Sequence, residues 1–143
     1  SYVESIAERL SLYTRLDDCE DEEALQRFEA ALIDRFGPLP RPVQSLLIAL
    51  RARWAAQDLG FERLILKNRQ LRLYFVSNPD SPYFESETFK TILQVIQLQL
   101  KNARLKNVGT NFMLIIDQVK SIEEVLNILQ RMKKTNEPAA INR

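Results

Sequence analysis

Histidine is absent from this 143-residue chain, and its absence excludes several classes of chemistry. Ser-His-Asp triads, Cys-His dyads, histidine-ligated zinc and histidine pH switches all require it. Cys19 is the only cysteine, so neither an internal disulfide nor a four-cysteine metal site can form within the chain. A single unpaired thiol fits a reducing compartment, and we expect a cytoplasmic protein.

Glycine and long apolar runs are also scarce. The three glycines, Gly37, Gly60 and Gly109, lie too far apart to form a Walker or Rossmann phosphate loop. No apolar run approaches the ~20 residues of a membrane span and no signal peptide opens the chain, so we expect no membrane partner. Asp117 follows an apolar run, where an acid is typical of a turn or cap. The sequence therefore predicts no catalytic, metal or cofactor site. Because the chain begins with Ser1, we expect a piece of a longer protein.

The composition that remains is that of an ordinary globular domain. Hydrophobic residues make up 45% of the chain and charged residues 27%. The length predicts a single domain over residues 1–134, followed by a polar tail over 135–143. The net charge of +1 conceals an asymmetry, because residues 1–60 carry a net −4 and residues 61–143 a net +5.

The first 60 residues predict three helices. Apolar side chains recur at helical spacing over residues 2–16, then from Leu25 to Phe36, and again over residues 43–59. Gly37 is typical of a helix C-cap, and Gly60 ends the third helix. Six acids fall within residues 17–23. They could form an interaction patch, but acids also gather where a helix begins, and we favour that interpretation.

Alternation of apolar and polar residues replaces the helical spacing after Gly60. It predicts a hairpin over residues 64–75, and the pattern as a whole predicts an α+β fold: three N-terminal helices, then a small, mostly antiparallel sheet (ββ-α-ββ-α) packed with two further helices. Ser121 and Glu124 form the pattern of a capping box. The other elements expected are a loop over 77–82, a helix over 86–100, a short strand over 101–106, a central strand over 111–119 and a final helix from 121.

Basic residues gather around the predicted hairpin. They predict an alternative function, a nucleic-acid-binding domain that uses this hairpin and the segment Lys101–Lys106. Phe75 shares its register with Leu71 and Leu73, so we expect it to face the core. The residues that carry this alternative are Arg63, Lys67, Arg69, Arg72 and Tyr74, with Lys101, Arg104 and Lys106.

The end of the second predicted helix carries an unusual charge. Phe36 and Leu39 are expected to pack inward, whereas Asp34 falls in the last helical turn. An acid there opposes the helix macrodipole and costs a few tenths of a kcal/mol, roughly. Such a residue invites a partner, either a base in its own domain or one in another protein surface.

At these residues the chain resembles the C-terminal domain of bacterial transcription-repair coupling factors. The similarity extends from Tyr2 to about Lys134 and follows the order of the elements. Its most specific part is the string Asp-Arg-Phe-Gly-Pro-Leu-Pro over residues 34–40. The motif residues are Phe36, Gly37 and Pro40, together with Arg9 and Tyr13 of the first predicted helix.

The resemblance implies a regulatory role without catalysis. Proteins of this family are ATP-driven DNA translocases that bind RNA polymerase stalled at lesions, remove it, and recruit nucleotide excision repair through UvrA. The C-terminal domain packs on an N-terminal UvrB-like module of the same protein and covers the surface that binds UvrA. It is expected to be monomeric and to hold no cofactor, since ATP and Mg²⁺ bind to the motor elsewhere.

Residue by residue, the resemblance places the contact near the end of the second helix. Asp34 would face basic side chains of the UvrB-like module, with Arg35 as its neighbour in the motif. The family often carries an acid where this chain has Ala31, although Glu29 and Asp34 could still supply negative charge. The contact with the UvrB-like module and the alternative, nucleic-acid binding, predict different behaviour in salt. Counterion release makes the affinity for nucleic acid fall steeply as salt rises, whereas one or two ion pairs between proteins make the affinity fall only slowly.

Overall fold

The computed structural model describes residues 14–136. The chain divides into two compact units, residues 1–48 and 49–143, and a single domain over 1–134 stays a prediction. The first predicted helix, with Arg9 and Tyr13, lies outside the described residues except for its helical end at 14–17. None of the helices in the described part of the chain is long and apolar enough to cross a bilayer.

Helix α2 (Glu22–Phe36) begins at the acidic run of the first unit. The side chain of Asp21 caps it by accepting a hydrogen bond of 2.8 Å from the N–H of Ala24. Glu22 and Glu23 then occupy the first turn, where the exposed N–H groups and the macrodipole favour negative charge. The interpretation of the acidic run as a helix start is therefore confirmed.

Helix α2 ends where the sequence predicts. Gly37 is its C-cap, with φ of +90°, and its N–H donates to the carbonyl of Ile33 at 2.8 Å. A side chain rarely adopts that φ, which explains why glycine stands here. Helix α3 (Arg41–Asp58) follows, and the carbonyl of Pro40 accepts from the N–H groups of Val43 and Gln44.

The second unit contains the sheet. Its strands are β1 (Arg63–Lys67), β2 (Gln70–Tyr74), β3 (Ala103–Val108) and β4 (Asn111–Ile116), in the order β1-β2-β4-β3. All neighbouring strands are antiparallel, which confirms the predicted α+β class. Strand β4 lies inside the sheet as predicted. It ends before residue 119 because Gln118 has a positive φ of 63° that breaks the extended backbone.

The β1–β2 hairpin turns in two residues. Asn68 and Arg69 have φ values of 53° and 61°, the conformation of a type I′ turn, whose twist matches that of the strands it joins. Asparagine is favoured in such a turn, whereas the second position usually carries glycine. The carbonyl of Arg69 accepts a hydrogen bond of 2.9 Å from the N–H of Val119, which ties the turn to the segment after β4.

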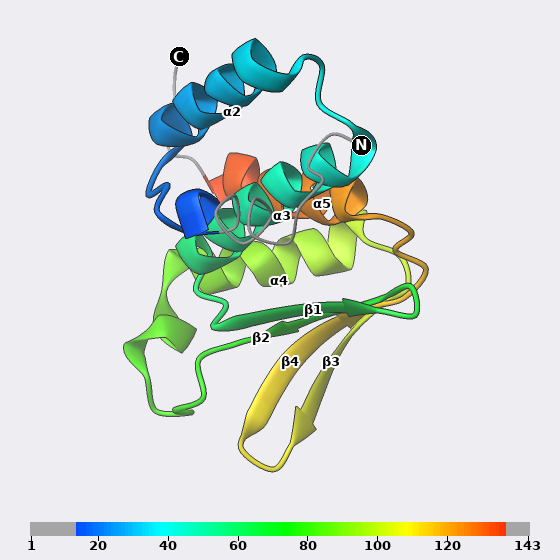
Figure 1. Ribbon diagram of the computed structural model, residues 1–143. Helices are drawn as coiled ribbons and strands as arrows, with labels where there is room; N and C mark the ends of the chain where they lie inside the picture. Colours follow the sequence, from blue (N-terminus) through cyan, green and yellow to red (C-terminus); the bar gives the residue numbers. More distant parts are fainter. Residues whose placement is uncertain (1–13, 137–143) are drawn as a thin grey trace. The chain divides into compact units, whose positions relative to one another are not determined.

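Helices cover one face of this sheet (Figure 1). They are the short 3-10 helix η1 (Pro82–Glu85), α4 (Glu87–Gln99) and α5 (Ile122–Asn136), with the end of α3. The hydroxyl of Ser121 accepts from the N–H of Glu124, as a capping box requires, but the Glu124 carboxylate accepts from Lys120. Alternate residues of the sheet meet buried helix residues in one core: Leu71, Leu73, Leu114 and Ile116 with Ile92, Val95, Val125, Leu129 and Met132.

Aromatic rings form one end of this core. Phe75 continues the alternation of the buried residues Leu71 and Leu73 and is itself only 2% exposed. Its ring packs against those of Phe61, Phe89 and Phe112, with centroids 4.9, 5.4 and 5.0 Å away. The prediction that Phe75 faces the core is confirmed. Tyr83 of η1 adds a hydrogen bond of 2.6 Å from its hydroxyl to the carbonyl of Leu59.

Candidate functional site

The end of α2 exposes the residues to which the resemblance assigns a contact. Asp34 is exposed in the last turn, and its carboxylate forms no ion pair with any of residues 14–136. Two large apolar side chains of the same turn are also exposed, Ile33 at 44% and Phe36 at 37%, although Phe36 lies roughly 160° from Asp34 around the helix axis. Exposed apolar side chains with charged groups at their edge fit a protein contact, in which a polar rim surrounds an apolar centre. We call Ile33, Asp34, Arg35 and Phe36 the α2 terminus.

The expectation that Phe36 packs inward is wrong. The buried residues of α2 are Leu25, Phe28 and Leu32, and Phe36 continues their spacing only at the last residue of the helix. There the chain turns at Gly37 and leaves the ring exposed, with the Arg35 guanidinium over it at 5.0 Å from the centroid. Leu39, also expected to pack inward, is half-buried.

Helix geometry separates the other predicted contact residues. At 100° per residue, Asp34 lies roughly 160° from the position of Leu32, which is on the buried stripe of α2. Ala31 lies roughly 60° from Asp34, on the same side, and Arg35 roughly 100° away. Glu29 lies roughly 140° from Asp34 around the axis, is half-buried, and has its own interactions. The structure therefore places Ala31 on the same side of α2 as Asp34, Arg35 at an intermediate angle, and Glu29 on the far side.

Ala31 stands in a more basic setting than the resemblance implies. It lines a shallow hollow of about 350 Å³ with Arg15, Asp18 and Arg27. Arg27 is held by Glu23 at 2.8 Å, one turn earlier on the same helix. With alanine in place of an acid, Asp34 is the acid left on this side of the last two turns.

Ile33 was missed by the sequence reasoning, although its position off the buried stripe was a usable signal.

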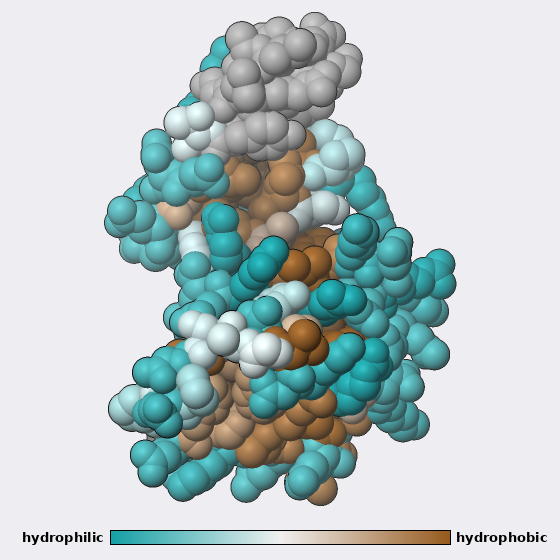
Figure 2. Space-filling model, turned by 90° about the horizontal axis from the view of Figure 1, so that it is seen from below, coloured by the Kyte–Doolittle hydropathy of each residue, from teal (hydrophilic) through white to brown (hydrophobic). Residues whose placement is uncertain are grey.

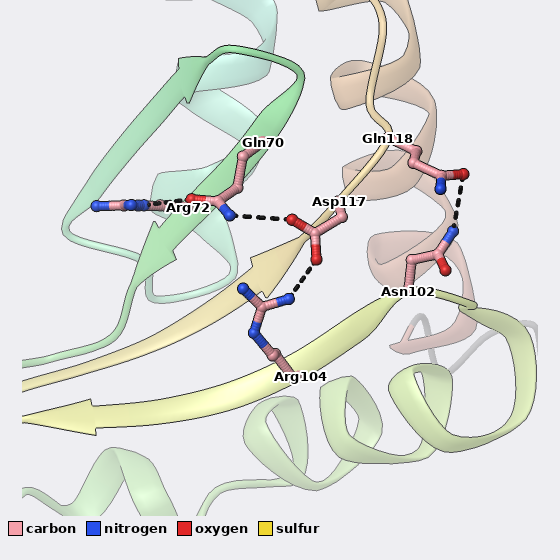
Figure 3. A network of polar contacts seen from close by, with 6 residues as sticks. All are labelled: Gln70, Arg72, Asn102, Arg104, Asp117 and Gln118. Atoms are coloured by element: carbon pink, nitrogen blue, oxygen red, sulfur yellow. Dashed lines mark hydrogen bonds and ion pairs between the residues drawn. The ribbon is translucent and has the colours of Figure 1, made fainter.

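A second group of polar residues lies on the sheet face opposite the helices (Figure 3). Asp117, directly after β4, accepts hydrogen bonds from the amide of Gln70 at 2.9 Å and from the guanidinium of Arg104. The side-chain oxygen Oε1 of Gln70 accepts a hydrogen bond of 2.7 Å from Nε of Arg72. The bond from Gln70, and then that from Arg104, hold the pKa of Asp117 below its ordinary value. Asp117 thus links three strands through neighbouring polar groups.

The predicted basic residues of the hairpin share one hollow on this face. Arg63, Lys67, Arg69 and Arg72 line it with Lys120, a residue that sequence reasoning did not include, and its volume is about 990 Å³. Figure 2 shows apolar side chains surrounded by hydrophilic ones on the side of the molecule seen there. We call the face of the sheet that the helices leave uncovered the outer face.

Comparison with known proteins supplies the family. The model of the TRCF domain matches residues 1–86. The chain belongs to the TRCF domain family. It is 40% identical over 63 residues to the transcription-repair-coupling factor of Escherichia coli (strain K12), covering 44% of this chain. It is 26% identical over 106 residues to that of Rickettsia bellii (strain RML369-C), covering 74%.

A solved structure confirms the fold of this TRCF domain. It is the crystal structure of the C-terminal domain of a transcription-repair coupling factor, with a TM-score of 0.70 and 18% identity. The match covers 94% of this chain and 82% of that one. By contrast, the matched span is 6% of the Escherichia coli protein and 9% of the Rickettsia protein. The resemblance stated from the motif at residues 34–40 is confirmed at the level of the family.

Proposed function

We propose that this chain is a non-catalytic, autoinhibitory domain that packs on an N-terminal UvrB-like module of the same protein and masks its UvrA-binding surface. The parent protein would be an ATP-dependent DNA translocase that removes RNA polymerase stalled at lesions and recruits nucleotide excision repair in the cytoplasm. ATP and Mg²⁺ would bind to the motor, and this domain would act as a monomer without a cofactor.

The observation that carries the proposal is the exposed Asp34 without an ion pair among residues 14–136. Its position in the last turn is unfavourable for the helix, and a cation outside the chain would compensate it. Ile33 and Phe36 add exposed apolar area in the same last turn of α2. An interfacial ion pair is worth ~1–3 kcal/mol, so the contact can hold the module and still be released.

Titration calorimetry of this chain against the isolated UvrB-like module tests the contact. We expect Asp34→Arg to weaken binding by about tenfold or more, because the substitution replaces an attraction by a repulsion. Asp80→Arg is the matched control: it makes the same charge change at an exposed position of the loop between β2 and η1 and should leave binding intact.

Two results would count against the proposal. Equal weakening by Asp34→Arg and Asp80→Arg would mean that only the net charge matters. Binding that is unchanged by Asp34→Arg would remove the α2 terminus from the interface. Raising the salt concentration should weaken the wild-type complex modestly, as expected for one or two ion pairs.

A further inference from the structure

The outer face concentrates cations that have no acidic partner. Arg63, Lys67 and Arg72 form no ion pair with any acid among residues 14–136. Two of the three lysines on the helices of the same unit have an acidic partner: Lys90 pairs with Glu87 at 3.3 Å and Lys133 with Asp58 at 2.7 Å. Unpaired cations on one side of a sheet repel one another, and a bound polyanion would relieve that repulsion.

The register sets the positions of these cations. Across the hairpin, Arg63 of β1 pairs with Tyr74 of β2, and Lys67 pairs with Gln70. Arg72 lies on β2 halfway between these two pairs, opposite Ile65. Arg104 and Lys106 project from the same side of β3, opposite Ile115 and Met113 of β4. Residues from different strands thus supply one group of cations, and Arg63, Lys67 and Arg72 line a common hollow with Lys120.

The floor of the outer face is apolar and carries an aromatic ring. Ile115 and Met113 point to this side and are only 2% and 6% exposed. In the register, Ile115 lies between Arg72 and Arg104, and Met113 between Tyr74 and Lys106. Tyr74 is half-buried, and the guanidinium of Arg63 stands over its ring at 5.2 Å from the centroid. Rings and guanidinium planes are the groups on which unpaired bases stack.

We propose that the outer face binds a single-stranded nucleic acid, independently of the contact made by the α2 terminus. Arg72, Lys67 and Lys120, which line one hollow, bind phosphates, and a base stacks at Tyr74 and Arg63. An open sheet face without a helix on it favours a single strand over a duplex, since a duplex groove is read by a helix or ribbon that projects into it. Asp117 holds Arg104 by a hydrogen bond. It also bonds to Gln70, which in turn bonds to Arg72 and orients its guanidinium toward the bound nucleic acid (Figure 3).

Fluorescence anisotropy of a labelled oligodeoxythymidylate, titrated with the chain at several salt concentrations, tests this. Neutralising three phosphates gives a slope of log affinity against log salt of about −2. Arg72→Glu should weaken binding roughly tenfold and make the slope shallower by about 0.7. Tyr74→Ala should weaken binding by roughly 5- to 100-fold with little change in the slope, because stacking releases no counterions.

Lys134→Glu is the matched control, since it makes the same kind of charge change at an exposed position of α5, which packs against the other side of the sheet. It should bind like the wild type, and circular dichroism should show all variants folded. A duplex of equal length that binds as tightly would overturn the proposal, as would equal losses in Arg72→Glu and Lys134→Glu. Tighter binding of polyglutamate than of the oligonucleotide would assign the face to an acidic protein segment instead.

Discussion

Strand β2 carries two different surfaces in five residues. Leu71 and Leu73 are completely buried under the helices, while Arg72 between them is exposed on the outer face. The same alternation distinguishes Phe75, enclosed by rings, from Tyr74, which lies under a guanidinium. Because successive side chains of a strand point to opposite sides, one short segment can hold the core together on one side and be free for recognition on the other.

Truncation of one aromatic on each side is the largest test of this comparison. Phe75→Ala should lower the free energy of unfolding by about 3–5 kcal/mol, since it leaves a cavity among Phe61, Phe89 and Phe112. Tyr74→Ala on the neighbouring position should cost about 1 kcal/mol or less. Denaturant unfolding followed by circular dichroism measures both, and similar losses would contradict the assignment of stability to the covered side.

Gly60 allows the covered side to close. It has a φ of +91°, and a Cβ built there would lie 2.1 Å from Cε1 of Tyr83. Gly60→Ala should therefore cost about 2–4 kcal/mol of unfolding free energy, from the strained backbone and the displaced ring. Gly109→Ala is the control: its φ is also positive, at +61°, but nothing lies within 4 Å of the added Cβ. It should cost less, and an equal cost would mean that the close approach to Tyr83 is unimportant.

The hydroxyl of Tyr83 has a smaller effect that depends on pH. Tyr83→Phe removes the bond to Leu59 and should cost about 0.5–1.5 kcal/mol near neutral pH. Burial raises the pKa of Tyr83, so the folded state favours the neutral phenol. That stability is complete below the unfolded pKa of about 10 and is lost as the pH rises above it. The difference between wild type and Tyr83→Phe should therefore shrink in alkaline urea titrations.

Asp117 on the outer face should have the smallest effect. Its hydrogen bonds lower its pKa, so the stability it contributes is present above the unfolded pKa of about 4 and disappears as the pH falls through the lower folded value. Asp117→Asn should leave the melting temperature nearly unchanged at low pH and lower it slightly at neutral pH. A wild-type protein that is as sensitive to acid as Asp117→Asn would show that the network adds nothing.

Features set by neighbouring residues were predictable from the sequence. Asp21, Gly37 and Ser121 determine where helices begin or end through bonds to residues at most four positions away. Gly37 and Ser121 were predicted as caps, and the acidic run that contains Asp21 was predicted to start a helix. The alternation that places Phe75 in the core is also local. These signals were enough to predict the α+β fold and the position of β4 inside the sheet.

Features that depend on distant residues were not predictable. The bond from Tyr83 to Leu59 spans 24 positions, and the one from Gln70 to Asp117 spans 47. The exposure of Phe36 was missed because the spacing of α2 is apolar up to its last residue, while packing decides which of those residues are covered. The candidate contact at Asp34 came from the motif, since its chemistry alone allowed a partner inside or outside the chain.

Retention of UvrA by the whole coupling factor that contains this chain tests the proposed masking most directly. Immobilised UvrA would be incubated with the wild-type factor, with Asp34→Arg and with Asp80→Arg, without DNA or polymerase. We predict that immobilised UvrA retains clearly more of the Asp34→Arg factor than of the wild type, because the UvrA-binding surface of this variant is uncovered. The Asp80→Arg factor should be retained like the wild type. Equal retention of all three would contradict an autoinhibitory contact at the α2 terminus.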